Sequence, residues 1–109
     1  MTQTAELTAP GASALGWSVA ISGNRIAGGA VTTTVHFNQF QGAAYLYERP
    51  QTGWKSTRRF NAELTSSDGM PNDEFGASVG ISGTAAVAGA PNATIGSNQF
   101  QGAAYVFGQ

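Results

Sequence analysis

The chain of 109 residues contains no cysteine, so neither a disulfide framework nor a thiolate zinc site can form. Charged residues make up 10% of the chain, against roughly 25% in an average soluble domain, and the net charge is -1. The few lysines and arginines are spread along the chain, apart from Arg58 and Arg59. This pattern offers no basic stripe for nucleic acid, so we expect no nucleic-acid partner.

Long apolar runs are also missing, so we expect no membrane insertion. The segment Met1–Thr4 lacks the positive and then apolar pattern of a signal peptide. Helix signals are nearly absent as well. Glycines instead mark the joints between short apolar stretches, which is typical of several short strands connected by tight turns.

What the chain does contain is an internal repeat. The octapeptide Asn38–Tyr45 returns unchanged as Asn98–Tyr105, an offset of 60 positions (98 minus 38). The match extends at the same offset to Gly16–Gly23 with Gly76–Gly83, and at an offset of 57 positions (62 minus 5) to Ala5–Thr8 with Ala62–Thr65. A period of this length is typical of a solenoid, a propeller or an array, in which each repeat is one supersecondary unit.

Each repeat is expected to supply four antiparallel strands. In the first copy these are Trp17–Ser22, Arg25–Val31, Gly42–Arg49 and Trp54–Thr65. Four strands in about 60 residues is the size of one blade of a β-propeller. We therefore predict an all-β fold of two four-stranded antiparallel blades. The whole chain, 1–109, forms a single two-blade unit, with these parts: 16–65 as blade one, 76–109 as the first three strands of blade two, and 1–8 as an outer strand for a neighbouring blade.

Two blades cannot close a ring, because propellers usually have about 4 to 8. The sequence therefore predicts a cyclic homo-oligomer completed by strand exchange, in which residues 2–8 of one chain complete the second blade of its neighbour. Two blades per chain allow only even rings. A trimer is the preferred assembly, with a tetramer next.

The glycine-rich motifs resemble a known family. Phe75–Gly76 followed by Gly89–Pro91 is similar to the FG-GAP repeat of integrin α-subunit propellers and many bacterial secreted proteins, and the first copy matches partly at Leu15–Gly16 and Gly29–Val31. The resemblance implies a propeller that serves adhesion, ligand binding or scaffolding rather than catalysis. It also implies an extracellular or cell-surface location.

We expect no cofactor and no metal ion. Integrin-type repeats often carry a calcium loop between the first two strands, but here the turns Ser22–Arg25 and Ser82–Ala85 lack a carboxylate. The weak alternative is the polar loop that contains Asp68, Asn72 and Asp73. Its spacing does not match an EF-hand, and Asp and Asn commonly cap turns through their own backbone, so a structural role is favoured.

The sequence offers few residues that could form a catalytic site. The only histidine, His36, lies in a loop with no acidic residue near it in sequence, and the second copy has Gly96 in its place. A general base needs an orienting partner and a nucleophile within reach. We therefore expect a protein that is not an enzyme.

The sequence supplies more residues suited to ligand binding, because aromatic faces stack on sugar rings while amides hydrogen-bond hydroxyl groups. Carbohydrate is the leading ligand class, as in a lectin, and Trp54 is a further aromatic candidate. The predicted ligand-binding residues are Trp17, His36, Asn38, Gln39, Gln41, Asn98, Gln99 and Gln101. In the alternative interpretation these residues are framework. The chain is then a purely structural, self-assembling propeller fragment or engineered half-propeller with no ligand of its own.

Overall fold

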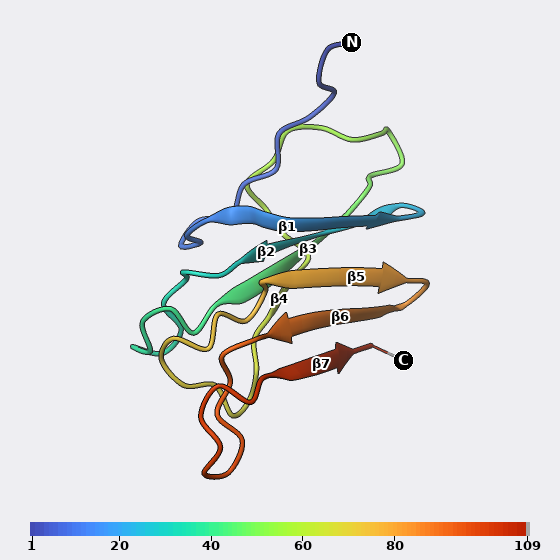
Figure 1. The fold of residues 1–109 in the computed structure, drawn as a ribbon. Coiled ribbons are helices and arrows are strands. Elements are labelled where there is room, and N and C mark those ends of the chain that lie inside the picture. The colour runs from blue at the N-terminus through green and yellow to red at the C-terminus, as the bar shows by residue number, and fades with distance from the viewer. Residues whose placement is uncertain (109) are drawn as a thin grey trace.

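A computed structural model of the chain describes residues 1–108, which form two antiparallel sheets stacked face to face (Figure 1). The first sheet has four strands in chain order: β1 (Leu15–Ser22), β2 (Arg25–Ala30), β3 (Ala43–Glu48) and β4 (Ala62–Leu64). The second sheet has three: β5 (Ser78–Ser82), β6 (Ala85–Ala90) and β7 (Ala103–Phe107). The predicted all-β class is confirmed. Gln109, where the predicted unit ends, lies outside the described residues.

The tight turns follow from glycine at one position of each hairpin. Ser22 pairs with Arg25 across a two-residue loop whose first residue, Gly23, has a φ of 57°. Gly83 has the same φ in the β5–β6 hairpin. A positive φ at the first loop residue matches a type II′ turn, whose twist suits the flanking strands. The repeat thus encodes the same hairpin twice.

The fourth strand is much shorter than the predicted Trp54–Thr65, because only Ala62–Leu64 pairs with β3. The cause lies at Asn61. Its side-chain Oδ1 accepts the hydrogen bond from the backbone N–H of Glu48 at 2.7 Å, and so ends the strand pairing there. Residues 49–61 instead form a loop at the end of the first sheet.

The N-terminal segment lies against that loop of its own chain. Leu7 forms an isolated parallel bridge with Thr57. Thr57 N–H donates to the Glu6 carbonyl at 3.0 Å, and Thr8 N–H donates to the Thr57 carbonyl at 2.9 Å. In the single chain, residues 6–8 therefore pair with the loop 49–61, and Leu7 packs against the buried cluster that contains Tyr45 and Tyr47.

The core lies on both faces of the first sheet. On the inner face, Ala27, Leu46 and Ala86 are buried together and join the two sheets, with Val79 and Ile81 packed against them. A second buried cluster surrounds Phe75 at the junction between the sheets; its members are Ala44, Ala88, Ala90 and Ala93.

On the outer face, Tyr45 and Tyr47 are buried beneath residues 7–12 and the loop 49–61. The Tyr45 hydroxyl donates to Glu63 at 2.9 Å, and burial together with this bond raises the pKa of Tyr45. No helix in residues 1–108 is long and apolar enough to cross a bilayer.

Candidate binding site

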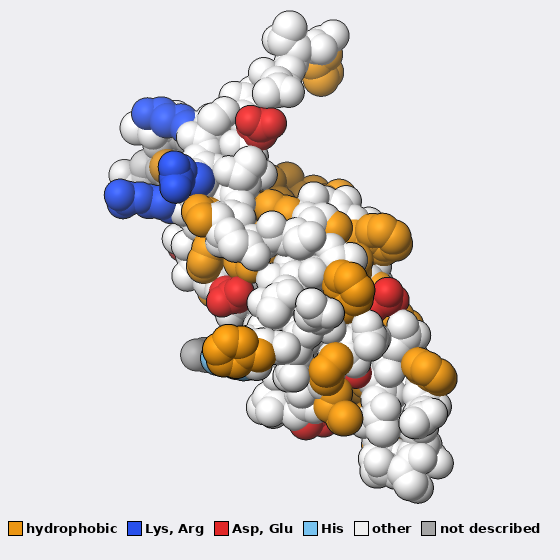
Figure 2. Space-filling view, turned by 90° about the vertical axis from the view of Figure 1, so that its left-hand side faces the viewer, with side chains coloured by type: hydrophobic (Ala, Val, Ile, Leu, Met, Phe, Trp, Pro, Cys, Tyr) orange, Lys and Arg blue, Asp and Glu red, His pale blue; other side chains and the backbone are white. Residues whose placement is uncertain are grey.

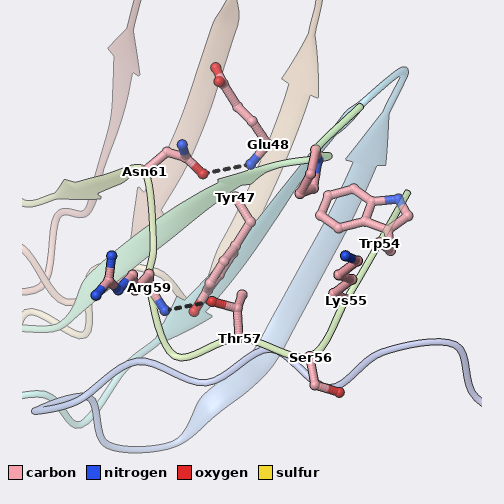
Figure 3. A pocket seen from close by; sticks show the side chains of 9 residues that line it. Tyr47, Glu48, Trp54, Lys55, Ser56, Thr57, Arg59 and Asn61 are labelled. Atoms are coloured by element: carbon pink, nitrogen blue, oxygen red, sulfur yellow. Dashed lines mark hydrogen bonds between the residues drawn. The ribbon is translucent and has the colours of Figure 1, made fainter. Parts of the chain in front are cut away.

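A hollow of about 370 Å³ opens beside Trp54, where β3 ends and the loop 49–61 begins (Figure 3). This volume falls within the range of roughly 300–1,000 Å³ that is usual for small-ligand sites. We call it the Trp54 pocket. It is lined by Tyr47, Glu48, Pro50, Trp54, Lys55, Ser56, Thr57, Arg59 and Asn61.

The pocket is held in place by the first sheet and the loop turn. The Gly53 N–H donates to the Pro50 carbonyl at 2.9 Å, which reverses the chain just before Trp54. The indole is half-buried and packs against the outer-face cluster that includes Tyr47. The Tyr47 hydroxyl in turn donates to the Thr8 carbonyl at 3.0 Å. The Trp54 and Tyr47 rings that line the pocket are therefore held in position by the residues packed against them.

Positive charge gathers around this pocket. Figure 2 shows the Lys and Arg side chains concentrated near the end of the molecule that carries the N-terminal segment. Four of the chain's five cations lie within residues 49–59, namely Arg49, Lys55, Arg58 and Arg59. The fifth, Arg25, donates to the Gly83 carbonyl at 2.9 Å. The interpretation that the cations are dispersed was therefore wrong, because four of the five lie in one short segment of the chain.

The predicted octapeptide residues occupy two different environments. In the first copy, Gln41 is only 3% exposed, and its amide accepts from Asn38 at 2.8 Å and donates to the Ser66 carbonyl at 3.4 Å. Asn38 also donates to the Gly69 carbonyl at 3.3 Å. These amides tie the octapeptide to the loop that enters the second sheet. Gln39, by contrast, has an exposed side chain.

In the second copy, Asn98 still donates to Gln101 at 3.0 Å, so the local geometry of the repeat is preserved. The residues are nevertheless all exposed: Asn98, Gln99, Phe100 and Gln101. The difference is that the loop 66–75 packs on the first copy of the octapeptide, and no described segment takes that place on the second.

The two other predicted ligand-binding residues lie outside the Trp54 pocket. Trp17 is exposed on β1, and His36 is exposed in the 35–38 turn with a φ of 49°. None of the eight predicted residues lines the pocket. The signal that could have located it is the concentration of cations around Trp54 in residues 49–59.

The acidic loop makes internal contacts. Asp73 is buried and accepts from the Met70 N–H at 3.0 Å, which is a turn-capping bond. Asp68 accepts from the Tyr105 hydroxyl at 2.9 Å, and burial together with this bond raises the pKa of Tyr105 to about 12. Asn72 has an exposed side chain and a φ of 69°. Within residues 1–108, no group of three or more His, Cys, Asp or Glu gathers as metal ligands would.

The contrast between the two octapeptides yields a direct prediction. Replacing Gln41 with alanine is expected to cost about 1–3 kcal/mol of unfolding free energy, because the Ser66 carbonyl loses its donor and the Asn38 amide loses one of its two acceptors. The same change at the exposed Gln101 is expected to cost less than about 0.5 kcal/mol. Urea unfolding of the two variants, followed by circular dichroism, measures this difference. Equal losses would contradict the assigned packing.

Two stacked antiparallel sheets built from one repeated sequence define an all-β repeat module. Residues 59–107, which span β4 to β7, match the family model of the FG-GAP repeat. That repeat suggests a β-propeller-like module, and its family is typically non-enzymatic. No curated protein matches the chain.

Proposed function

We propose that the chain is a non-enzymatic binding module whose ligand is a carbohydrate held in the Trp54 pocket. The observation that carries this proposal is a half-buried indole on a supported wall, with polar and cationic side chains around it. Sugar rings have an apolar face that stacks on an indole, and hydroxyl groups that bind polar side chains. The extracellular or cell-surface setting of this proposal rests on the family resemblance.

The charge of the pocket favours an acidic sugar. Lys55 and Arg59 line it, and Glu48 is the one acidic residue in the lining. A guanidinium can bind a carboxylate through two parallel hydrogen bonds, which a neutral hydroxymethyl group cannot reproduce. Uronic-acid units are therefore the proposed ligand class.

A matched pair of glycans tests this proposal. Oligogalacturonate and a neutral galactose oligomer of the same length differ mainly in the carboxylate at each unit. Isothermal titration is expected to give binding of oligogalacturonate that is roughly tenfold tighter, the equivalent of about 1.4 kcal/mol. If neither glycan binds, the carbohydrate proposal is rejected. If both bind equally well, the preference for acidic units is rejected.

Variants then locate the site. Arg59→Glu is expected to weaken oligogalacturonate binding at least roughly tenfold, because it reverses a charge in the pocket lining. Arg58→Glu makes the same change of net charge at a neighbouring residue outside the lining, and serves as the control. Trp54→Ala is expected to abolish binding, whereas Trp17→Ala leaves it intact. Equal effects at Arg58 and Arg59 would mean attraction by net charge alone.

A purely structural role is the second candidate. The observation that favours it is the large apolar surface left uncovered on both sheets, including Val19 and Ile21 on the first and Val87 and Val106 on the second. In this case the chain acts through assembly and has no ligand of its own. If the protein is well folded and no glycan binds it, the purely structural role is the function that remains.

A further inference from the structure

One face of the second sheet is uncovered, although its counterpart in the first sheet is buried. Val87 and Val106 occupy the repeat positions of Ala27 and Leu46. Ala27 and Leu46 are buried against the second sheet, whereas Val106 is 76% exposed. Together with Gly80, the two valines line a shallow hollow of about 290 Å³. We call this surface the free face.

The complementary surface lies on the outer side of the first sheet. Val19 and Ile21 on β1 are 70% and 67% exposed. Their repeat counterparts, Val79 and Ile81, pack against the buried cluster that includes Leu46. We call the surface around Val19 and Ile21 the leading face. The chain thus buries one sheet-to-sheet interface and leaves both halves of an equivalent interface open.

The match extends to the backbone contacts. Within the chain, the Ser18 hydroxyl donates to the Gly76 carbonyl at 2.8 Å, and Gly29 lies against the same carbonyl. The repeat places Ser78 and Gly89 on the free face in the same roles. It also places Gly16 at the leading face as the counterpart of Gly76. All the groups needed for a second copy of this contact are therefore present.

We propose that the free face of one chain docks on the leading face of a second copy of the same chain, head to tail. This interface repeats the internal one, with Ser78 and Gly89 meeting the Gly16 carbonyl of the second copy. No charged residue lies beside Val87 and Val106 on the free face, or beside Val19 and Ile21 on the leading face. The two surfaces therefore meet without burying an unpaired charge. The proposal is independent of the carbohydrate site.

The N-terminal segment supports the same arrangement. Glu6 and Thr8 direct their bonded backbone groups toward Thr57, so Leu7 directs its own N–H and carbonyl to the opposite edge. Leu7 is the repeat counterpart of Leu64, which pairs with Ala44. By the same register, Leu7 would pair with Ala104 of the neighbouring chain, on the outer edge of β7. A docked copy would thereby complete the second sheet with a fourth strand.

A head-to-tail contact uses two different surfaces, so repeated docking must close into a ring or grow as a filament. We expect a closed ring. Native mass spectrometry of the wild-type chain is expected to give one species at a whole multiple of 11.2 kDa. Three copies is the preferred number. A monomer or a broad series of sizes would overturn the ring. A monomer would also mean that another repeat of the same kind, and not a second copy of this chain, covers the free face.

Two single variants test which faces meet. Val106→Lys on the free face and Val19→Lys on the leading face each place a charge in the interface, which is expected to weaken docking by roughly a hundredfold or more. Both proteins should be monomeric. Thr52→Lys, in the exposed 50–53 turn, is the control and should assemble as the wild type does. Circular dichroism confirms that each variant is folded.

Mixing the two monomeric variants separates this proposal from every symmetric alternative. The Val19→Lys chain keeps an intact free face, and the Val106→Lys chain keeps an intact leading face. An equimolar mixture is therefore expected to form a heterodimer at twice 11.2 kDa that grows no further. A contact between two identical faces predicts no such heterodimer. A mixture that remains monomeric would overturn the head-to-tail arrangement.

Discussion

Replacing Gly29 with alanine is expected to lower the free energy of unfolding by about 3 kcal/mol or more, whereas alanine at Gly89 costs less than about 1 kcal/mol. A Cβ at Gly29 would collide with the carbonyl oxygen of Gly76, which lies just before β5. That backbone is held in place because the Gly76 N–H donates to the Gly89 carbonyl at 2.9 Å. The collision can be relieved only by separating the two sheets.

Gly89 is the matched control because it occupies the same repeat position on the uncovered sheet. A Cβ there would meet the Ser78 hydroxyl at 2.6 Å, and this group can rotate away. Both alanines are best measured in the Val19→Lys background, where assembly does not contribute to stability. Urea unfolding followed by circular dichroism gives the two free energies. Similar losses at the two glycines would show that the sheets do not approach as closely as described.

Replacing Phe75 with alanine is expected to cost about 4 kcal/mol, within the range for removing a buried ring. Phe75 is 0% exposed, and its ring lies 5.6 Å from the ring of Tyr105 and 5.9 Å from that of Phe107. The ring also packs with Ala44 of the first sheet. Its loss therefore leaves a cavity at the junction where the two sheets meet.

Phe100→Ala removes a side chain of the same type from an exposed position in the second octapeptide, and serves as the control. Phe100 is 69% exposed, so its loss is expected to change the unfolding free energy by less than about 0.5 kcal/mol. Thermal unfolding of the Phe75→Ala protein should occur far below that of the Phe100→Ala protein. Comparable midpoints would argue against Phe75 as the side chain that anchors the junction.

The repeat and its glycines predict the hairpins well, because local turn chemistry determines them. Ser22–Arg25 and Ser82–Ala85 carry glycine at the one position that requires a positive φ, and both form two-residue turns. The fourth strand was predicted too long for a reason that is also local. A single hydrogen bond from the Glu48 N–H to the Asn61 side chain replaces the strand pairing there, and no periodicity in the sequence reveals such a bond.

Burial was not predictable from the repeat, since identical residues have different neighbours. Gln41 is buried and Gln101 is exposed, although each lies in the same eight-residue sequence. What differs is the chain that packs on them, which is a tertiary property. The Trp54 pocket was missed for a related reason: Glu48, Trp54 and Arg59 come together only when the loop 49–61 closes. Ligand binding by the octapeptide amides stays a prediction.

The outer edge of β7 has a consequence for how this protein must be handled. Among the described residues β7 pairs on one side only, and Ala103–Phe107 contains no charged residue and no proline. Such an edge lacks the usual protection against strand addition by unrelated chains, including the first step toward amyloid. Correct docking and aggregation therefore compete for the same backbone groups. The yield of soluble protein becomes a matter of rates, set by concentration and temperature during refolding, even where the docked state is the more stable one.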